Sequence, residues 1–387
     1  MKYAPSLHRR LRPGHRGFTL IELLVAVAIG LGLTLAITVM LIRSEAGRRS
    51  LTSVNDVSAN GAYLAFTLDR TLRSAGSGYS QAWKLGYGCP LRVARSGTTI
   101  LPRTGAFPAP FAGVGTGVRM APLVVQAGAG TGGSDILIIG TGASGLGESP
   151  QPVLPGSSTA SNLRVPSTVG LRAGDLVALM QDGGTCLVQQ VASGFVGGAD
   201  QQLNFGGTYY NSTIDGVTLT SIGAPFAAVA TALGNVTGNR PAFQLLGIGA
   251  NNTLFSYDLL RLDGSDAVVP VADGVVDLRA RYGVDSNDDG VVDTWVDPAV
   301  APWNSASLLD GSVASRTSLS RIVAVRVAVV LRNSAPERDP VSPATLTLFN
   351  DMPPGLPVIH NVTDNTFRYR VLEFTVPLRN VMMVPRT

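Results

Sequence analysis

The feature that most constrains the fold of this chain is an apolar run near its N-terminus. Residues 18–42 read FTLIELLVAVAIGLGLTLAITVMLI, 25 residues with a single charged side chain, Glu22, and Arg43 follows directly. As an α-helix this run would be roughly 37 Å long, which exceeds the roughly 30 Å hydrocarbon thickness of a bilayer. The run therefore predicts a transmembrane helix over residues 18–42.

The residues before this run are strongly basic. Residues 1–17 contain Lys2 and four arginines and no acidic side chain, so removing them would change the formal charge from +4 to −1. Basic residues that precede an apolar run stay on the cytoplasmic side, which places everything after Arg43 outside the cytoplasm. Without residues 1–17 the chain is nearly neutral, and no basic patch is left to bind the phosphates of a nucleic acid.

Two common N-terminal segments fit this sequence poorly. A secretory signal peptide has a shorter apolar core that ends in small residues, whereas this run ends in MLIRS. A plain signal anchor fits the length and the flanking charges, but it does not explain a carboxylate at the fifth position of the run, where charge is costly. Glu22 therefore requires a specific role.

The segment RGFTLIELLVAVAIG resembles the leader and helix start of type IV pilins and pseudopilins. The resemblance implies that residues 1–17 are a prepilin leader peptide. It also implies that prepilin peptidase cuts after Gly17 and methylates the new N-terminal residue, Phe18. Glu22 is then expected to pair with the charged N-terminus of a neighbouring subunit during assembly, because a cationic partner relieves the cost of a carboxylate in hydrocarbon.

Beyond the apolar run, hydrophobic residues recur every three or four positions from Leu51 to Leu72, which indicates an amphipathic helix. We expect one helical region over 18–76, ending near Gly76 and Gly78. Residues 77–387 show short apolar runs between turn residues, which indicates a β-rich head. Strands are predicted at 135–140, 175–180, 185–191, 216–222, 275–284, 321–332 and 369–378, with 321–332 central and the proline-rich stretch 150–166 in loops. The predicted fold class is α+β: a long N-terminal helix, half transmembrane and half amphipathic, packed on a large, mostly antiparallel β head.

Three later segments, DRTLRSAG, AGDLVALMQDGGTCLVQQV and YGVDSNDDGVVDTW, resemble the minor-pilin subfamily called PilW. This resemblance implies a protein of the bacterial inner membrane with a periplasmic head that later enters the pilus. The implied partners are other minor pilins, the major pilin, prepilin peptidase and an adhesin at the pilus tip. The implied role is to prime or cap pilus assembly. The alternatives are a J-like pseudopilin of type II secretion and a membrane-anchored, calcium-binding adhesin or enzyme.

One segment of the head has the oxygen-ligand spacing of a calcium loop. Asp285, Asn287, Asp289 and Asp293 occupy places one, three, five and nine, and the Val291 carbonyl is a further candidate ligand. Val296 stands at place twelve, where an EF-hand has a glutamate, so an EF-hand is excluded. The segment predicts either a calcium loop of another kind or an Asp/Asn-rich turn whose side chains bond their own backbone.

Few residues suit catalysis. His360 is the single histidine after the leader, which argues against histidine-based triads and zinc clusters, so we expect no enzymatic activity. The two cysteines, Cys89 and Cys186, both follow the apolar run and would lie in an oxidising compartment. A disulfide between them is predicted, with two unpaired buried thiols as the alternative.

Overall fold

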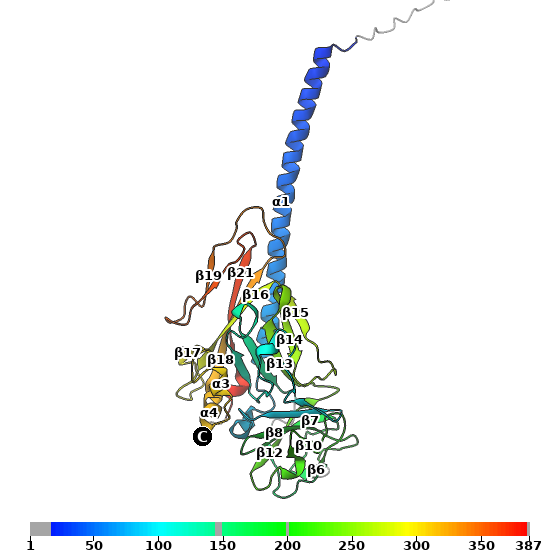
Figure 1. Ribbon diagram of the computed structural model, residues 1–387, viewed down its shortest axis with the longest axis vertical. Helices are drawn as coiled ribbons and strands as arrows, with labels where there is room; N and C mark the ends of the chain where they lie inside the picture. The colour runs from blue at the N-terminus through cyan, green and yellow to red at the C-terminus, as the bar shows by residue number, and fades with distance from the viewer. Residues whose placement is uncertain (1–16, 144–148, 199–200, 385–387) are drawn as a thin grey trace, which may run out of the picture. The chain divides into compact units, whose positions relative to one another are not determined.

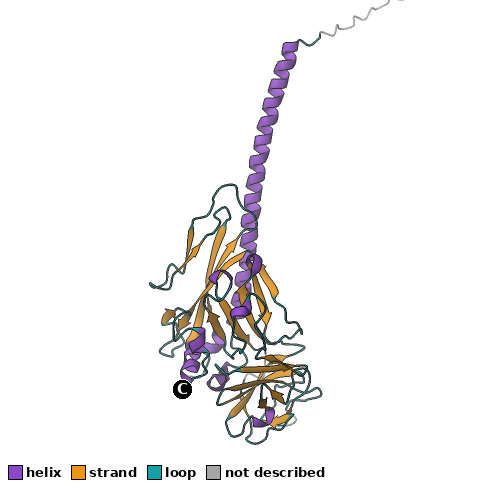
Figure 2. Ribbon diagram, viewed as in Figure 1, coloured by secondary structure: helices purple, strands orange, loops and turns teal. Residues whose placement is uncertain are grey.

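The computed structural model describes residues 17–143, 149–198 and 201–384. Residues 1–16 of the expected leader lie outside this range. The chain divides into two compact units, Met1–Ser53 and Val54–Thr387, and each is described by itself. The α+β layout is as predicted: an N-terminal helix is followed by a mostly antiparallel β head (Figures 1 and 2).

The long helix α1 (Leu20–Arg73) is assigned as 54 residues without interruption. Its first part, Leu20–Ile42, is the one stretch among the described residues that is long and apolar enough to cross a membrane. None of this part is buried inside the structure. A row of leucine, isoleucine and valine side chains left in water would be unfavourable by roughly 25 cal/mol per Å² of apolar surface, so this part requires lipid or other helices around it.

Inside the second unit, α1 is amphipathic because its apolar residues follow the helical repeat. Leu64, Leu68 and Leu72 are almost completely buried on one face. Gly61 lies on the same face, where an added Cβ would come within 3.0 Å of side-chain atoms of Leu331 and Leu372. A glycine there lets the helix backbone approach the sheet closely.

The C-terminal end of α1 is held by backbone and side-chain bonds. Gly76 adopts a φ of 80° and donates its N–H to the Gly140 carbonyl at 2.8 Å. The Asn380 amide donates to the Ser74 and Ala75 carbonyls at 3.2 and 3.1 Å. The backbone groups just after Arg73 are thus bonded to distant parts of the chain, which anchors the end of α1. The end of the helix is close to the predicted one.

Two nearby substitutions, one on the buried face of α1 and one on its exposed face, are expected to change the free energy of unfolding by very different amounts. Leu68→Ala is expected to lower the free energy of unfolding by about 2–5 kcal/mol, because it leaves a cavity in the core. Phe66→Ala, two residues earlier, removes a larger side chain that is 65% exposed, so its effect should stay within about 0.5 kcal/mol. Urea unfolding of the two full-length variants in detergent would measure both, and equal losses would contradict the orientation of the helix.

The head is built on three larger sheets. The four-stranded sheet has the spatial order β17 (Thr294–Val296), β16 (Val275–Val284), β18 (Ile322–Arg332) and β21 (Tyr369–Pro377). The five-stranded sheet has the order β15 (Val269–Asp273), β14 (Thr253–Asp258), β13 (Ala242–Ile248), β4 (Ile136–Thr141) and β3 (Leu123–Gln126). The six-stranded sheet has the order β2 (Thr98–Leu101), β1 (Leu91–Arg95), β8 (Thr185–Gln190), β7 (Asp175–Gln181), β12 (Ala228–Asn235) and β5 (Gln151–Pro152). Every pairing in these sheets is antiparallel except that of β1 with β8.

Smaller elements connect these sheets. The two-stranded ribbons are β6 (Asn162–Arg164) with β9 (Gln202–Asn204), β10 (Thr213–Ile214) with β11 (Val217–Thr218), and β19 (Thr345–Leu348) with β20 (Val358–Asn361). The short helices are α2 (Trp83–Gly86), α3 (Ser305–Leu308), α4 (Val313–Arg321) and α5 (Arg379–Met382). Single 3₁₀ turns lie at Ser80–Ala82, Phe111–Gly113, Thr131–Gly133, Leu219–Ser221 and Ala250–Asn252.

The main core contains the buried face of α1 and residues of all three larger sheets, and a second cluster contains other residues of the six-stranded sheet. Strand β18 was predicted to be central, and it lies between β16 and β21 with nearly every residue buried. Two local predictions were wrong. The expected strand at 216–222 is only β11 followed by a 3₁₀ turn, and the stretch 150–166 contains β5 and β6. Pro152 is tolerated in β5 because that strand lies at a sheet edge.

Candidate assembly site

The predicted cleavage point lies just before the first turn of α1. Gly17, Phe18 and Thr19 are not helical, and the Phe18 side chain is 89% exposed. A Cβ added to Gly17 would meet nothing within 4 Å. The bond after Gly17 is therefore in an open, non-helical segment that a protease can bind in extended form.

Glu22 takes part in a capping box at the start of α1. The Thr19 backbone N–H and the Thr19 hydroxyl donate to Glu22 Oε2 at 3.0 and 2.9 Å. The Glu22 N–H points back to Thr19 Oγ1 at 3.4 Å. This reciprocal arrangement satisfies N–H groups that a helix start otherwise leaves unpaired. The spacing Thr-x-x-Glu is readable from the sequence, whereas the resemblance to pilins predicts only pairing between subunits for Glu22.

The two hydrogen bonds that Thr19 donates to Glu22 both go to Oε2, so the capping box is compatible with an ion pair between chains. Glu22 Oε1 accepts no hydrogen bond from the described residues. Glu22 also lies among exposed apolar side chains, for example Ile21 at 71% and Leu23 at 62% exposure. A cation supplied by a neighbouring chain could reach Oε1 while Oε2 keeps the helix start in place.

A pair of exposed aromatic side chains lies on the part of α1 that belongs to the second unit. Tyr63 and Phe66 are 58% and 65% exposed and lie three residues apart, so they are neighbours on one helix face. Both lie away from the buried stripe of leucines. Aromatic side chains are enriched in protein interfaces, which makes this pair a candidate contact for a neighbouring subunit.

The two cysteines form the predicted disulfide. Cys89 and Cys186 are bonded, with a Cα–Cα distance of 5.8 Å, and both are nearly completely buried. Cys186 lies on β8, directly opposite Leu91 of β1 in the parallel pair. The bond therefore holds together the only parallel pair among the described strands, β1 and β8, which are far apart in sequence.

The loop predicted to bind calcium is organised by its own backbone. Asp285 is completely buried, and its Oδ1 accepts the N–H groups of Asp288 and Asp289 at 2.7 and 3.2 Å. Its Oδ2 accepts the Gly290 N–H at 2.7 Å. Asp289 Oδ1 accepts the N–H of Val291 at 2.8 Å. These carboxylates thus close tight turns between β16 and β17.

The other end of the loop is held in the same way. Asp293 Oδ2 accepts the Ser286 hydroxyl and N–H at 2.6 and 2.7 Å, and Oδ1 accepts the Asn287 amide at 3.3 Å. The Ser286 hydroxyl bond, followed by the N–H bond, lowers the pKa of Asp293. Within the described part of the chain, no group of three or more His, Cys, Asp or Glu side chains could hold a metal ion. Calcium binding is therefore not supported, because the loop's oxygens point to its own N–H donors.

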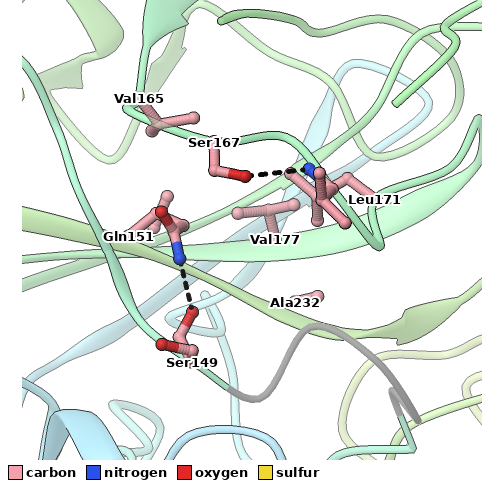
Figure 3. A pocket seen from close by; sticks show the side chains of 9 residues that line it. Ser149, Gln151, Val165, Ser167, Leu171, Val177 and Ala232 are labelled. Atoms are coloured by element: carbon pink, nitrogen blue, oxygen red, sulfur yellow. Dashed lines mark hydrogen bonds between the residues drawn. The ribbon is translucent and has the colours of Figure 1, made fainter. Parts of the chain in front are cut away.

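A small cavity in the head offers no catalytic chemistry. It lies beside β7 and β12 and has a volume of ≈ 40 Å³, room for about three water molecules at most. Much of its wall consists of Val165, Leu171, Val177 and Ala232, and the Gln151 side-chain amide donates a hydrogen bond to the Ser149 carbonyl (Figure 3). Among the described residues that line it, none has a charged side chain. Its size and lining suit a packing defect rather than a substrate.

The comparisons with known proteins match two parts of the chain. Residues 12–38 match the prokaryotic N-terminal methylation motif, and residues 247–380 match Type IV Pilus-assembly protein W. The second match runs from β13 through β21, so it includes YGVDSNDDGVVDTW, whereas the segments at 69–76 and 173–191 lie outside it. No curated protein and no solved structure matches the chain significantly.

Both matches agree with the architecture. The methylation motif covers the open segment, the capping box and the first turns of α1, and the second match covers the four-stranded sheet on which α1 packs. The six-stranded sheet lies outside both matches. The two matches, together with the apolar N-terminal helix and the antiparallel β head, support a PilW-like minor pilin of type IV pili.

Proposed function

We propose that this minor pilin primes or caps pilus assembly together with other minor pilins. Before assembly it is inserted in the inner membrane with its N-terminus in the cytoplasm and its head in the periplasm. Prepilin peptidase cuts it after Gly17 and methylates Phe18. It then packs through α1 against other minor pilins and the major pilin, at a position that an adhesin can join.

One observation carries this proposal. Within one helix, a fully exposed apolar half carries the matched methylation motif, and the other half forms part of the core of a β head with a pilus-assembly match. The exposed apolar half of such a helix can be covered in two environments, the bilayer and a bundle of similar helices. A filament built from such helices supplies the second.

The alternatives have less support. The match to a pilus-assembly family favours a pilus over the J-like pseudopilin of type II secretion. A calcium-binding adhesin would need a metal site, and the loop at 285–293 offers its carboxylates to backbone N–H groups instead. The pilin matches also indicate a structural protein rather than an enzyme.

Deleting the gene and counting surface pili tests the priming role. We expect few or no pili in the deletion strain, and restoration when the full chain is supplied again. The same strain complemented with a chain that lacks residues 77–387 should stay without pili, because the head carries the contacts to the other minor pilins. Normal pilus numbers in the deletion strain would contradict the proposal.

The processing step has its own test. Gly17→Val is expected to block cleavage, so the chain isolated from membranes would keep its leader, whereas the wild-type chain would begin at methylated Phe18. Since a Cβ at position 17 meets nothing within 4 Å, the substitution should leave the fold unchanged and act on the peptidase alone. N-terminal peptide mass spectrometry measures both. A normally processed Gly17→Val chain would show that the cut lies elsewhere.

A further inference from the structure

The edge of the four-stranded sheet formed by β21 is open. β21 is nine residues long and pairs with β18 along its whole length, and no described strand pairs with its other side. Its sequence, YRVLEFTVP, is largely apolar and contains no lysine. An edge of this length and composition is a template for another strand.

The backbone groups on this open edge can be assigned from the bonds at its two ends. The Tyr369 N–H donates away from β18, to the Ser342 hydroxyl at 3.3 Å. The Leu378 N–H donates toward β18, to the Val323 carbonyl at 2.8 Å. Since donors alternate along a strand, the outward N–H groups belong to Val371, Glu373 and Thr375. None of the three has a backbone partner on that side among the described residues.

The other sheet edges are shortened or blocked. β17 has three residues and leaves the tight loop at 285–293, and β2 and β3 have four residues each. β15 contains Pro270, and the two-residue β5 contains Pro152. Short strands and prolines are the means by which proteins protect edges from unwanted pairing. The long β21 edge lacks this protection up to Pro377, its last residue.

The direction of β21 identifies the kind of partner. Arg370 bonds Ser58, Leu372 packs against Gly61 and Asn380 bonds Ser74, so β21 and the second half of α1 run side by side in the same direction. Two copies joined by antiparallel β21 edges would have their α1 helices in opposite directions. In an assembly whose α1 helices all point in the same direction, a neighbouring head would instead lie alongside the second half of α1 and β21.

A cavity at the start of β21 can take a side chain of the added strand. It has a volume of ≈ 260 Å³ and is lined by α1, the loop at 341–342 and the first residues of β21. Two arginines contribute to its wall. Arg368 is paired with Glu337 at 2.9 Å, whereas Arg370 bonds the Ser58 hydroxyl and has no carboxylate partner in the described structure. An acidic side chain on the partner strand would complement Arg370.

We propose that β21 receives an extended strand from a neighbouring, different pilin-type subunit, with an acidic residue of that strand beside Arg370. This inference rests on the proposed function, because packing of α1 helices is what brings the neighbour to this edge. The added strand would bond the outward backbone groups of Val371, Glu373 and Thr375.

Thr375→Pro in the full-length chain tests the strand addition. Thr375 is exposed and its N–H is not used by β18, so proline should be tolerated by the fold while it removes a donor from the edge. We expect about a tenfold decrease in the neighbouring pilin recovered with the purified chain from detergent-solubilised membranes. Thr375→Ala, which keeps the N–H, is the matched control and should recover wild-type amounts. Arg370→Glu should weaken recovery, whereas Arg370→Lys should preserve it.

A photo-crosslinking residue at position 375 gives a second measurement that does not depend on the proline variant. An adduct with a different pilin-type subunit is expected. The proposal would be overturned by an adduct with a second copy of this chain, or by the lack of any adduct in cells whose pili contain the crosslinker-bearing chain. Full recovery of the neighbouring pilin with Thr375→Pro would overturn it as well. The Glu22→Ala chain distinguishes failure of the strand addition from failure of the proposed function. If Glu22→Ala is missing from pili while Thr375→Pro behaves as wild type, the strand addition at β21 is wrong and the proposed function stands.

Discussion

Glu22→Ala is expected to leave the chain cleaved and inserted in the membrane, yet to remove most of it from pili. A carboxylate in hydrocarbon costs about 2.5–3.5 kcal/mol on insertion scales, and an opposite charge relieves this cost. In our account the relief comes from the Phe18 amine of a neighbouring subunit, which cleavage after Gly17 creates. The measurement is the amount of the chain in sheared pili relative to that in membranes.

The capping box makes a sharper experiment possible. Glu22→Gln keeps a carbonyl oxygen that can accept from Thr19, so it preserves the helix start and removes the charge. Thr19→Ala does the opposite, because it removes a hydroxyl and leaves the carboxylate. If intermolecular pairing matters, Glu22→Gln should behave as Glu22→Ala does and Thr19→Ala should assemble. Normal assembly of Glu22→Gln would show that capping is the role of Glu22.

Loss of the disulfide should markedly lower the stability of the head. Cys89 and Cys186 are 97 residues apart in sequence. Closing a loop of about 100 residues stabilises a protein by up to ~4.7 kcal/mol in the chain-entropy model, and measured values are typically about 2–4 kcal/mol. We therefore expect the Cys89→Ala/Cys186→Ala chain to lose roughly 2–4 kcal/mol of unfolding free energy. Urea unfolding in detergent, followed by tryptophan fluorescence, provides the measurement.

Chemical reduction of the wild-type chain is the matched control for this loss. Reduction opens the loop but leaves both sulfur atoms in the core, so a similar loss would assign the effect to the bond and not to packing. A much smaller loss on reduction would indicate that the alanine variant fails through its cavities. Two reactive thiols in the denatured, unreduced chain would contradict the bond itself.

The parts of the fold that the sequence predicted best are those with strong, local periodicity. Residues 321–332 are nearly all apolar, and they form the buried central strand β18. The amphipathic spacing through Leu64 and Leu68 likewise predicted the buried face of α1. In both cases one physical requirement, burial of apolar surface, determines the local structure.

Other elements depend on contacts that the sequence does not display. Strand β12, AVATALGN, is rich in alanine, which favours helices, and pairing with β7 holds it extended. The short strand β5 includes Pro152 and exists because β12 offers it an edge. Such strands follow from tertiary pairing rather than from local preference.

The candidate site shows the same division. Roles for Gly17, Phe18 and Glu22 in processing and pairing could be predicted from the sequence because the three residues belong to one short motif. The loop at 285–293 could not be decided, since a calcium loop and an Asx-type turn use the same residues at the same spacing. The structure distinguishes them through Asp285, whose two oxygens accept three backbone N–H groups. The open edge of β21 was not visible at all, because an edge is a property of the whole sheet.

The most direct test of the central claim is peptide mass spectrometry of sheared, washed pili from cells that express the chain at its natural level. We expect the chain to be present in the pili, to be far less abundant than the main subunit, and to begin at methylated Phe18. A chain that stays in the membrane fraction, in cells that form normal pili without it, would contradict the claim.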